Sequence, residues 1–112
     1  RHAEVYRGSF AISVCPSENV ESPTIVGAQA ANELLNIIGI KASFVLTEYN
    51  DKIYISSRSI DEINVQIIME KLGGGGHLNV AGAQLTGVTI VQAKRMIQDT
   101  LDEMLKEGDI EE

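Results

Sequence analysis

The sequence predicts an α/β domain in which a mixed β-sheet is flanked by helices. Segments with the two-residue period of strands alternate along the chain with segments whose apolar residues recur at helical spacing. Two of the strands are joined by the short turn signal Asn50-Asp51, which makes an antiparallel hairpin. A sheet that alternates with helices and also contains a hairpin is mixed, and this is the basis of the assignment.

The first strand is predicted at 9–14, where small residues alternate with large apolar ones, the pattern of a strand with one well-buried face. A helix should begin at Ser22, which suits the N-cap, with Pro23 in the first helical position. Its apolar residues recur as far as Ile38, and Gly39 ends the run.

The hairpin follows, with strands at 44–49 and 52–57. Alternation along the second strand places successive side chains on opposite faces. Ile53, Ile55 and Ser57 share one face, and Tyr54, Ser56 and Arg58 share the other. Arg58 stands at the end of this strand.

The second helix is predicted to begin after Asn64 as N-cap, with Ile63 and Ile68 forming a hydrophobic staple. Its core-facing side carries a stripe at helical spacing, which consists of Val65, Ile68, Met69 and Leu72. Gly73 then stands where a glycine in the left-handed conformation ends a helix.

A short strand at 82–86 precedes the last helix. Thr89 and Gln92 form a capping box, and the helix runs to about Glu107 with Gly108 as its stop. Its buried face is predicted to carry Ile90, Ala93, Ile97, Leu101 and Met104.

The length of 112 residues is that of one domain. We expect residues 1–8 to be a lead-in from an upstream domain, 9–108 to be the domain itself, and 109–112 to be an acidic tail. The chain begins with Arg1 rather than methionine, which indicates a fragment of a longer protein. The acidic residues from Asp102 to Glu112 are expected on a solvated helix end.

The balance of 16 acidic and 9 basic residues gives a net charge of −7. It argues against broad binding to long nucleic acid, which needs a basic face, but permits a small anionic ligand in a local cradle. Cys15 is the only cysteine, which excludes an internal disulfide and a cysteine-based zinc cluster and fits a reducing, cytosolic setting. No signal peptide is visible, and no apolar run approaches the ~20 residues of a membrane span.

The strongest functional signal is the run Gly73–Gly76 followed by His77. Consecutive glycines leave backbone N–H groups unobstructed and permit positive φ, so the chain can fold closely around an anionic oxygen. The histidine can donate a hydrogen bond, carry charge or bind metal. A flexible linker is the alternative, but Leu72 and the small residues that follow favour a packed turn.

Arg58 and its neighbours Ser57 and Ser59 complete the candidate site. Arginine holds phosphate in a bidentate fork, and serine hydroxyls add neutral hydrogen bonds. The alternative is that Arg58 pairs with a surface carboxylate.

These residues resemble a known family. Arg58-Ser59, a short helix, the Gly-Gly-Gly-Gly-His run and the nearby Ala81-Gly82 are similar to the DHHA1 domain of DHH-type phosphoesterases over nearly the whole chain. The runs 28–35 and 55–59, with Asn64-Val65, most resemble the cyclic-di-AMP phosphodiesterases of the GdpP type.

The resemblance implies a division of labour. An upstream DHH domain would hold two metal ions, commonly manganese, and the DHHA1 domain would bind the nucleotide. A metal-activated water would then open cyclic-di-AMP to the linear dinucleotide pApA. His77 would be the catalytic contact at the scissile phosphate or its neighbour. The substrate contacts carried over are Ser57, Arg58, Ser59, Gly74, Gly75, Gly76 and His77.

The chain departs from the complete enzyme because it has no Asp-His-His triplet, and its only histidines are His2 and His77. A metal site of that kind needs several converging carboxylates and imidazoles. We therefore assign no metal ligand here, expect Mn²⁺ in the upstream domain, and expect no hydrolysis by this chain alone. His2 should be solvent-exposed. The parent protein would lie in the cytoplasm, anchored by upstream membrane helices, with no direct membrane contact by this domain.

Other functions would use the same motifs. An oligonucleotidase or pAp phosphatase of the same family would need the same glycines and histidine. A RecJ-like exonuclease would need a basic track for the strand, against which the net charge counts. A non-catalytic module that binds nucleotide or mediates assembly, as in alanyl-tRNA synthetases, is an alternative of another class. The helix at 89–107 could pack against a second copy, so a homodimer stays open.

Overall fold

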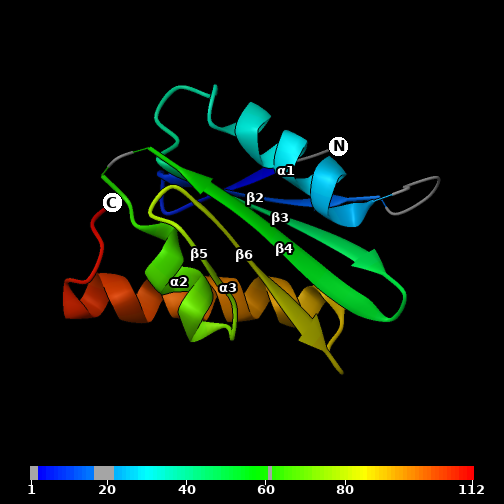
Figure 1. The fold of residues 1–112 in the computed structure, drawn as a ribbon. Coiled ribbons are helices and arrows are strands. Elements are labelled where there is room, and N and C mark those ends of the chain that lie inside the picture. The colour runs from blue at the N-terminus through cyan, green and yellow to red at the C-terminus, as the bar shows by residue number, and fades with distance from the viewer. Residues whose placement is uncertain (1–2, 17–21, 61) are drawn as a thin grey trace.

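Figure 1 shows the computed structural model of the chain, which describes residues 3–16, 22–60 and 62–112. Six strands form one sheet in the order β1-β2-β3-β4-β6-β5. The strands are β1 (Ala3–Tyr6), β2 (Phe10–Cys15), β3 (Ala42–Tyr49), β4 (Lys52–Ser59), β5 (Gly75–Gly76) and β6 (Val80–Thr86). The helices are α1 (Pro23–Leu34), α2 (Val65–Lys71) and α3 (Ile90–Glu107). Helix α1 covers one face of the sheet and α2 and α3 cover the other, so the predicted fold class is confirmed (Figure 1). The predicted position of His2 lies outside the described residues.

The sheet is mixed because β2 and β3 pair in parallel, with α1 crossing between them. The other described strand pairs are antiparallel. In the β3–β4 hairpin, Asn50 and Asp51 have φ values of 51° and 62°. Positive φ at both turn residues belongs to the two-residue turn that matches the twist of the strands, so the predicted hairpin is confirmed.

Strand β2 differs from its prediction. One well-buried face was expected, but all four residues from Phe10 to Ser13 are almost completely buried. The reason is the position of β2 in the sheet, where α1 covers one face and α3 the other (Figure 1).

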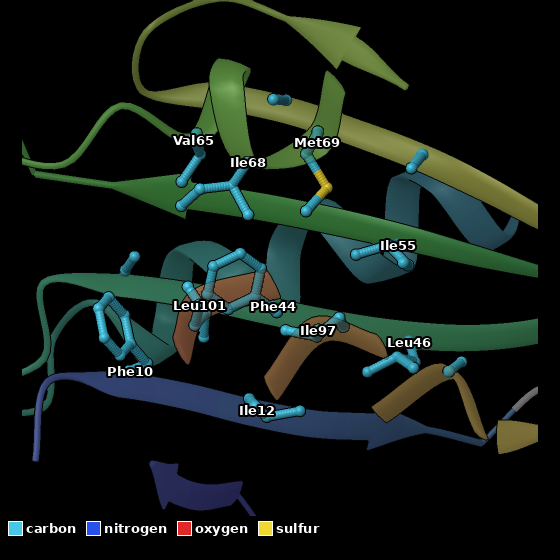
Figure 2. Close-up of a cluster of buried hydrophobic side chains, with 14 of the residues drawn as sticks. Phe10, Ile12, Phe44, Leu46, Ile55, Val65, Ile68, Met69, Ile97 and Leu101 are labelled. Atoms are coloured by element: carbon cyan, nitrogen blue, oxygen red, sulfur yellow. The ribbon is translucent and has the colours of Figure 1, made fainter. Parts of the chain in front are cut away.

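The larger core lies between the sheet and the helices α2 and α3 (Figure 2). Phe10 and Phe44 meet in it, with ring centroids 6.5 Å apart and ring planes tilted by 54°. The helices contribute the residues predicted for their buried faces. These are Val65, Ile68 and Met69 from α2 and Ala93, Ile97, Leu101 and Met104 from α3, with Leu72 and Ile90 partly buried.

The smaller core lies under α1 and is built from small residues. Its buried members are Cys15, Ala30, Ala31 and Val45. At Gly27 the helix touches the sheet, because a Cβ there would lie only 2.6 Å from the Ser56 hydroxyl oxygen. Small side chains therefore let α1 lie directly on β3 and β4.

Helix α1 ends earlier than predicted. The apolar spacing extended to Ile38, but the helix ends at Leu34 and Ile38 is fully exposed. Beyond the helix the amide of Ile37 donates to the carbonyl of Leu34, and Gly39 has a φ of 90°. These turns bring the chain back toward β3, and they bury Ile40 in place of Ile38.

The predicted helix caps are confirmed. The side chains of Ser22 and Asn64 accept hydrogen bonds from the first turns of α1 and α2. Thr89 and Gln92 form the reciprocal capping box of α3, and Gly108 ends that helix with a φ of 80°.

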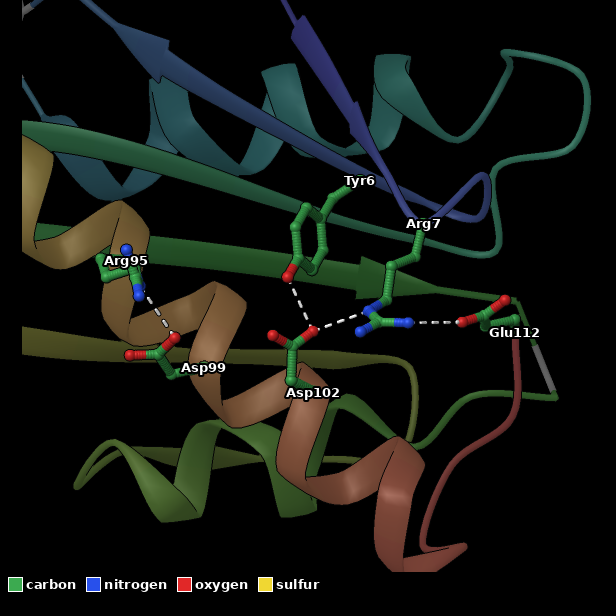
Figure 3. Close-up of polar contacts among 6 residues, drawn as sticks. All are labelled: Tyr6, Arg7, Arg95, Asp99, Asp102 and Glu112. Atoms are coloured by element: carbon green, nitrogen blue, oxygen red, sulfur yellow. Dashed lines mark hydrogen bonds and ion pairs between the residues drawn. The ribbon is translucent and has the colours of Figure 1, made fainter.

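Strand β1 lies within residues 1–8, for which the sequence predicted only a lead-in. It pairs with β2 and is tied to α3 by side-chain contacts (Figure 3). The Tyr6 hydroxyl and the Arg7 Nε both donate to Asp102 Oδ1 at 2.7 Å. Lys94 of α3 forms an ion pair with Glu4 of β1 at 2.8 Å. The edge strand is thus joined to the helix layer by polar contacts.

The acidic C-terminal region is more than a solvated helix end, because some of its residues make tertiary contacts. Asp102 accepts two hydrogen bonds, Glu112 lies 3.3 Å from Arg7, and Ile110 is buried in the larger core. The prediction for these acidic residues is corrected, because the side chains of Tyr6 and Arg7 come from the other end of the sequence and could not be placed from the local pattern.

We predict that Asp102 makes stability depend on acid pH. The hydrogen bond from Tyr6 lowers the pKa of the Asp102 carboxyl below its usual value. A folded-state pKa below the unfolded one stabilises the protein above the unfolded pKa, and this contribution is lost as the pH falls through the folded value. Asp102→Asn should lower Tm by about 2–5 °C at neutral pH, and its Tm should then fall less than that of the wild type upon acidification.

Asp99→Asn is the matched control for this experiment. Asp99 lies on the same helix and makes an exposed ion pair with Arg95 at 2.9 Å, four residues apart (Figure 3). Such pairs contribute little, so this variant should behave like the wild type. Equal Tm losses of Asp102→Asn and Asp99→Asn between pH 7 and about pH 3 would contradict the role of Asp102.

Candidate functional site

An open pocket of about 610 Å³ lies on the face of the sheet that carries α1. Its walls are α1 on one side and the glycine run with β5 on the other, and its floor is formed by β4 and β6. The lining residues are Thr24 and Ala28 of α1, Tyr54, Ile55, Ser56 and Arg58 of β4, residues 73–77, and residues 80–84 of β6.

The pocket exists because α1 is centred over β2, β3 and β4 and leaves β6 and β5 uncovered on that face (Figure 1). On the other face, α2 and α3 pack against the sheet. The fold therefore leaves a hollow at one side of α1, at the end of the sheet where the glycine run lies.

The strand register places Arg58 and His77 in one row, at positions directly opposite one another across β4, β6 and the end of β5. Arg58 is paired with Val80 across β4 and β6, and the amide of His77 donates to the carbonyl of Val80 at 2.7 Å. Neighbouring strands lie about 4.8 Å apart, so the Cα atoms of Arg58 and His77 are roughly 10 Å apart. Residues directly opposite one another point to the same face, and both side chains border the pocket.

Arg58 has donors to spare. Its Nη1 donates to the carbonyl of Ser57 at 2.8 Å, which leaves the other guanidinium N–H groups available. Within the described part of the chain, no carboxylate forms an ion pair with it, so the predicted alternative of a surface carboxylate partner is not seen there. Burial lowers the pKa of Arg58, but an arginine stays charged at neutral pH.

The pocket is cationic although the protein is acidic. None of the described residues that line it is an aspartate or glutamate, and Arg58 is the lining residue with a permanent charge. Its uncharged polar groups come from Thr24, Tyr54, Ser56 and Gln84. The site therefore suits an anionic ligand that also offers neutral hydrogen-bonding groups.

The four glycines have different tasks. Gly73, with a φ of 84°, ends α2 as predicted. The amide of Gly74 donates to the carbonyl of Met69 at 2.8 Å, and that of Gly73 to Glu70 at 3.1 Å, which is the Schellman pattern. The prediction that Gly74 offers its N–H to a phosphate is thus corrected, because the end of α2 already uses that donor.

Gly75 and Gly76 form β5 at the edge of the sheet. A Cβ at Gly76 would lie 2.5 Å from the Cα of Ala81, and the φ of Gly76 is 145°, so close packing on β6 requires glycine. A Cβ at Gly75 would have no atom within 4 Å, and Gly75 faces the open pocket. Since His77 and Val80 bond to each other, the alternating ladder directs the Gly76 N–H away from β6, where it stays available.

Ser57 and Ser59 are not part of the pocket, which corrects their prediction as substrate contacts. Ser57 is fully buried on the face toward the larger core, and within the described part of the chain its hydroxyl has no hydrogen-bond partner. The Ser59 hydroxyl donates to the carbonyl of Ile63 and accepts from the side chain of Asn79. These bonds fix the segment that follows His77, so Ser59 stabilises the turn without lining the pocket.

Ser56 is the serine that lines the pocket, together with Thr24, Tyr54 and Gln84. The alternation along β4 already placed Tyr54 and Ser56 on the face of Arg58, and this signal could have found them. Thr24 and Gln84 come from α1 and β6, and only the assembled sheet brings them to the same place.

The described residues provide no group of three histidine, cysteine, aspartate or glutamate side chains that could hold a metal ion. Within the same residues, no helix has the length and apolar character needed to cross a membrane.

Several known proteins are similar to this chain in sequence. The cyclic-di-AMP phosphodiesterase PdeA of Listeria monocytogenes is 47% identical over 100 residues, covering 88% of this chain and 15% of PdeA. The cyclic-di-AMP phosphodiesterase GdpP of Bacillus subtilis is 37% identical over 110 residues, covering 96% of this chain and 17% of GdpP. The bifunctional oligoribonuclease and PAP phosphatase NrnA of Thermus thermophilus is 35% identical over 71 residues, 62% of this chain and 22% of NrnA. The chain thus spans less than a quarter of the length of each of these relatives.

A solved structure supports the fold. An exopolyphosphatase-related protein of Bacteroides fragilis superposes with a TM-score of 0.79 at 23% identity, covering 91% of this chain and 31% of that protein. The family model described as the DHHA1 domain matches residues 8–107. This chain belongs to the DHHA1 domain family.

Proposed function

We propose that this chain is the substrate-binding domain of a metal-dependent phosphodiesterase that hydrolyses cyclic-di-AMP to pApA. The observation that carries the proposal is the pairing of β4, β6 and β5. Among the described residues, it brings an arginine without a carboxylate partner and an exposed histidine to one row of a pocket that has no acidic lining residue. The similarity to PdeA and GdpP over most of the chain supports the choice of substrate.

The residues of the pocket would act on the phosphate as hydrogen-bond donors. The free N–H groups of Arg58 bind two phosphate oxygens at once, and the N–H of Gly76 adds a backbone donor at the sheet edge. His77 lies opposite Arg58 and contacts the scissile phosphate or its neighbour. Together these groups hold the phosphodiester in place.

The described residues do not fit a metal site, so we assign no hydrolytic step to them. We infer that the metal ions, Mn²⁺ by the family resemblance, belong to an upstream DHH domain of the parent protein. The 112-residue chain alone should then bind nucleotide without hydrolysing it. By the same resemblance, the parent lies in the cytoplasm, anchored to a membrane by helices outside this chain.

A second candidate is an oligonucleotidase or pAp phosphatase of the same family, which the similarity to NrnA favours. That similarity covers 62% of this chain, against 88% for PdeA, which is why we place it second. A non-catalytic nucleotide-binding or assembly module would use the same pocket without turnover.

We predict that the parent protein, with its upstream domain, hydrolyses cyclic-di-AMP faster than pApA when Mn²⁺ is present. His77→Ala and Arg58→Lys should each lower kcat/KM for cyclic-di-AMP by about tenfold or more. His77→Ala removes the proposed phosphate contact, and the lysine ammonium of Arg58→Lys cannot reproduce the bidentate contact of the guanidinium. Arg95→Lys is the matched control, because Arg95 is exposed on α3 and pairs with Asp99 outside the pocket. Faster turnover of pApA would favour the oligonucleotidase, and turnover of neither would favour the binding module.

We predict that substitutions at the neighbouring residues Gly75 and Gly76 have different effects, the first on ligand binding and the second on stability. Gly75→Val should leave Tm within a few degrees of the wild type and weaken pApA binding, because its side chain enters the open pocket. The φ of Gly75 is not positive, so the substitution acts through the space that its side chain fills and not through backbone strain. Gly76→Val should lower Tm strongly, because its Cβ would collide with Ala81 at a φ unsuited to L-residues.

Thermal melts and isothermal titration of the 112-residue chain with pApA measure both effects. Unchanged affinity in a folded Gly75→Val protein would contradict the role of the glycine run in binding. A Gly76→Val protein as stable as the wild type would contradict the packing of β5 on β6.

A further inference from the structure

The end of the pocket away from Arg58 has a different chemical character. Tyr54 of β4 is paired with Gln84 of β6 and lies on the same face as the Arg58 row. Thr24, from the first turn of α1, borders the same pocket. This end therefore presents an aromatic ring, a side-chain amide and a hydroxyl, and it carries no charged side chain among the described lining residues.

The side chains of Tyr54 and Gln84 make no hydrogen bond within the described part of the chain. Tyr54 is half-buried and Gln84 is exposed. Neither residue belongs to the two hydrophobic cores. Their functional groups are therefore available to a ligand.

The two ends of the pocket are separated along β4 by four residue steps, from Tyr54 to Arg58. At about 3.3 Å per residue this distance is about 13 Å between Cα atoms, and the arginine side chain reaches back over part of it. Between the ends lie Ser56, Gly75 and Gly82, whose small size leaves space above the sheet for a ligand. A ligand that uses both ends must carry an anionic group and a flat, hydrogen-bonding group well apart, as a nucleotide does.

We infer that Tyr54 and Gln84 form a base-recognition site that receives the nucleobase of a nucleotide whose phosphate is bound by Arg58 and His77. This inference rests on the proposed function and adds the determinant of base specificity to it. The Tyr54 ring stacks on the base, an interaction that every base can make. Gln84 lies at the strand position directly opposite, where its amide can meet the edge of the stacked base.

The amide of Gln84 selects the type of base. A glutamine offers one acceptor and one donor side by side, which match the N6 amino group and N7 of adenine. Guanine presents two acceptors, O6 and N7, on the same edge, so one contact is lost and an acceptor faces an acceptor. The site should therefore prefer adenine to guanine.

The test is isothermal titration of the 112-residue chain with pApA, pGpG and ribose 5-phosphate, which has no base. The wild type should bind pApA more tightly than pGpG. Gln84→Leu should lower the ratio of the two affinities by about tenfold. Tyr54→Leu should weaken both dinucleotides by about tenfold and leave ribose 5-phosphate unchanged, whereas Tyr54→Phe should bind like the wild type because it keeps the ring.

Matched controls lie outside the pocket. Tyr49→Leu removes a half-buried tyrosine from the end of β3, and Gln29→Leu removes an exposed glutamine from α1. Neither should change the affinities. Circular dichroism and Tm of each variant verify that the fold is kept. If Tyr54→Leu loses stability, Tyr54→Val replaces it, because a β-branched residue suits a strand and also removes the ring.

The outcomes separate the inference from the proposed function. If Arg58→Lys weakens all three ligands while Gln84→Leu leaves the pApA to pGpG ratio unchanged, the base-recognition site is overturned and phosphate binding stands. The same holds if Tyr54→Leu weakens ribose 5-phosphate as much as pApA. If Arg58→Lys changes none of the affinities, the proposed function and the inference fail together.

Discussion

The antiparallel ladder that joins β4 to β6 and β6 to β5 is the constraint on which the site depends. It places Arg58 opposite Val80, and Val80 beside His77, although Arg58 and His77 are separated in the sequence by a helix and the glycine run. Side chains alternate between the two faces of a strand, so a slip of one residue would turn Arg58 toward the larger core and Ser57 toward the pocket. The buried residues Ile53 and Ile55 on the core face oppose such a slip, because it would bring them into the open hollow. The same apolar packing that stabilises the sheet thus fixes the geometry of the site.

The two faces of the sheet are covered unequally, and this inequality makes the pocket. On one face α2 and α3 bury the larger core, which holds both phenylalanines (Figure 2). On the other, α1 lies close to β3 and β4 through Gly27, Ala30 and Ala31 and leaves the β6–β5 side bare. A larger residue at Gly27 would push the helix away from Ser56. The position of α1, which forms one wall of the pocket, therefore depends on glycine at this site.

Charge is distributed by the fold in a way that suits an anionic ligand. Arg7 lies between Asp102 and Glu112, and Lys94 pairs with Glu4, at the opposite edge of the sheet from the glycine run (Figure 3). Arg58 has no such partner among the described residues and keeps its donors for the pocket. A net charge of −7 therefore coexists with a local cationic site, because the strength of a site depends on the charges within a few ångströms and salt screens the more distant ones.

The sequence by itself determined the local features of this domain. The caps at Ser22, Asn64 and Thr89, the β3–β4 hairpin and the apolar faces of α2 and α3 follow from hydrogen bonds and spacings between residues near one another in the chain. The glycine run with His77, together with Arg58-Ser59, the short helix between them and Ala81-Gly82, also indicated the family.

Only the tertiary structure decided which of the candidate residues meet. It removed Ser57 and Ser59 from the pocket and brought in Thr24 and Gln84. It also ended α1 at Leu34 and tied β1 to α3 through Asp102. The physical reason is the same in each case: these outcomes depend on strand register and on helices packed over the sheet. Contacts of that kind join residues far apart in the sequence, and no local pattern encodes them.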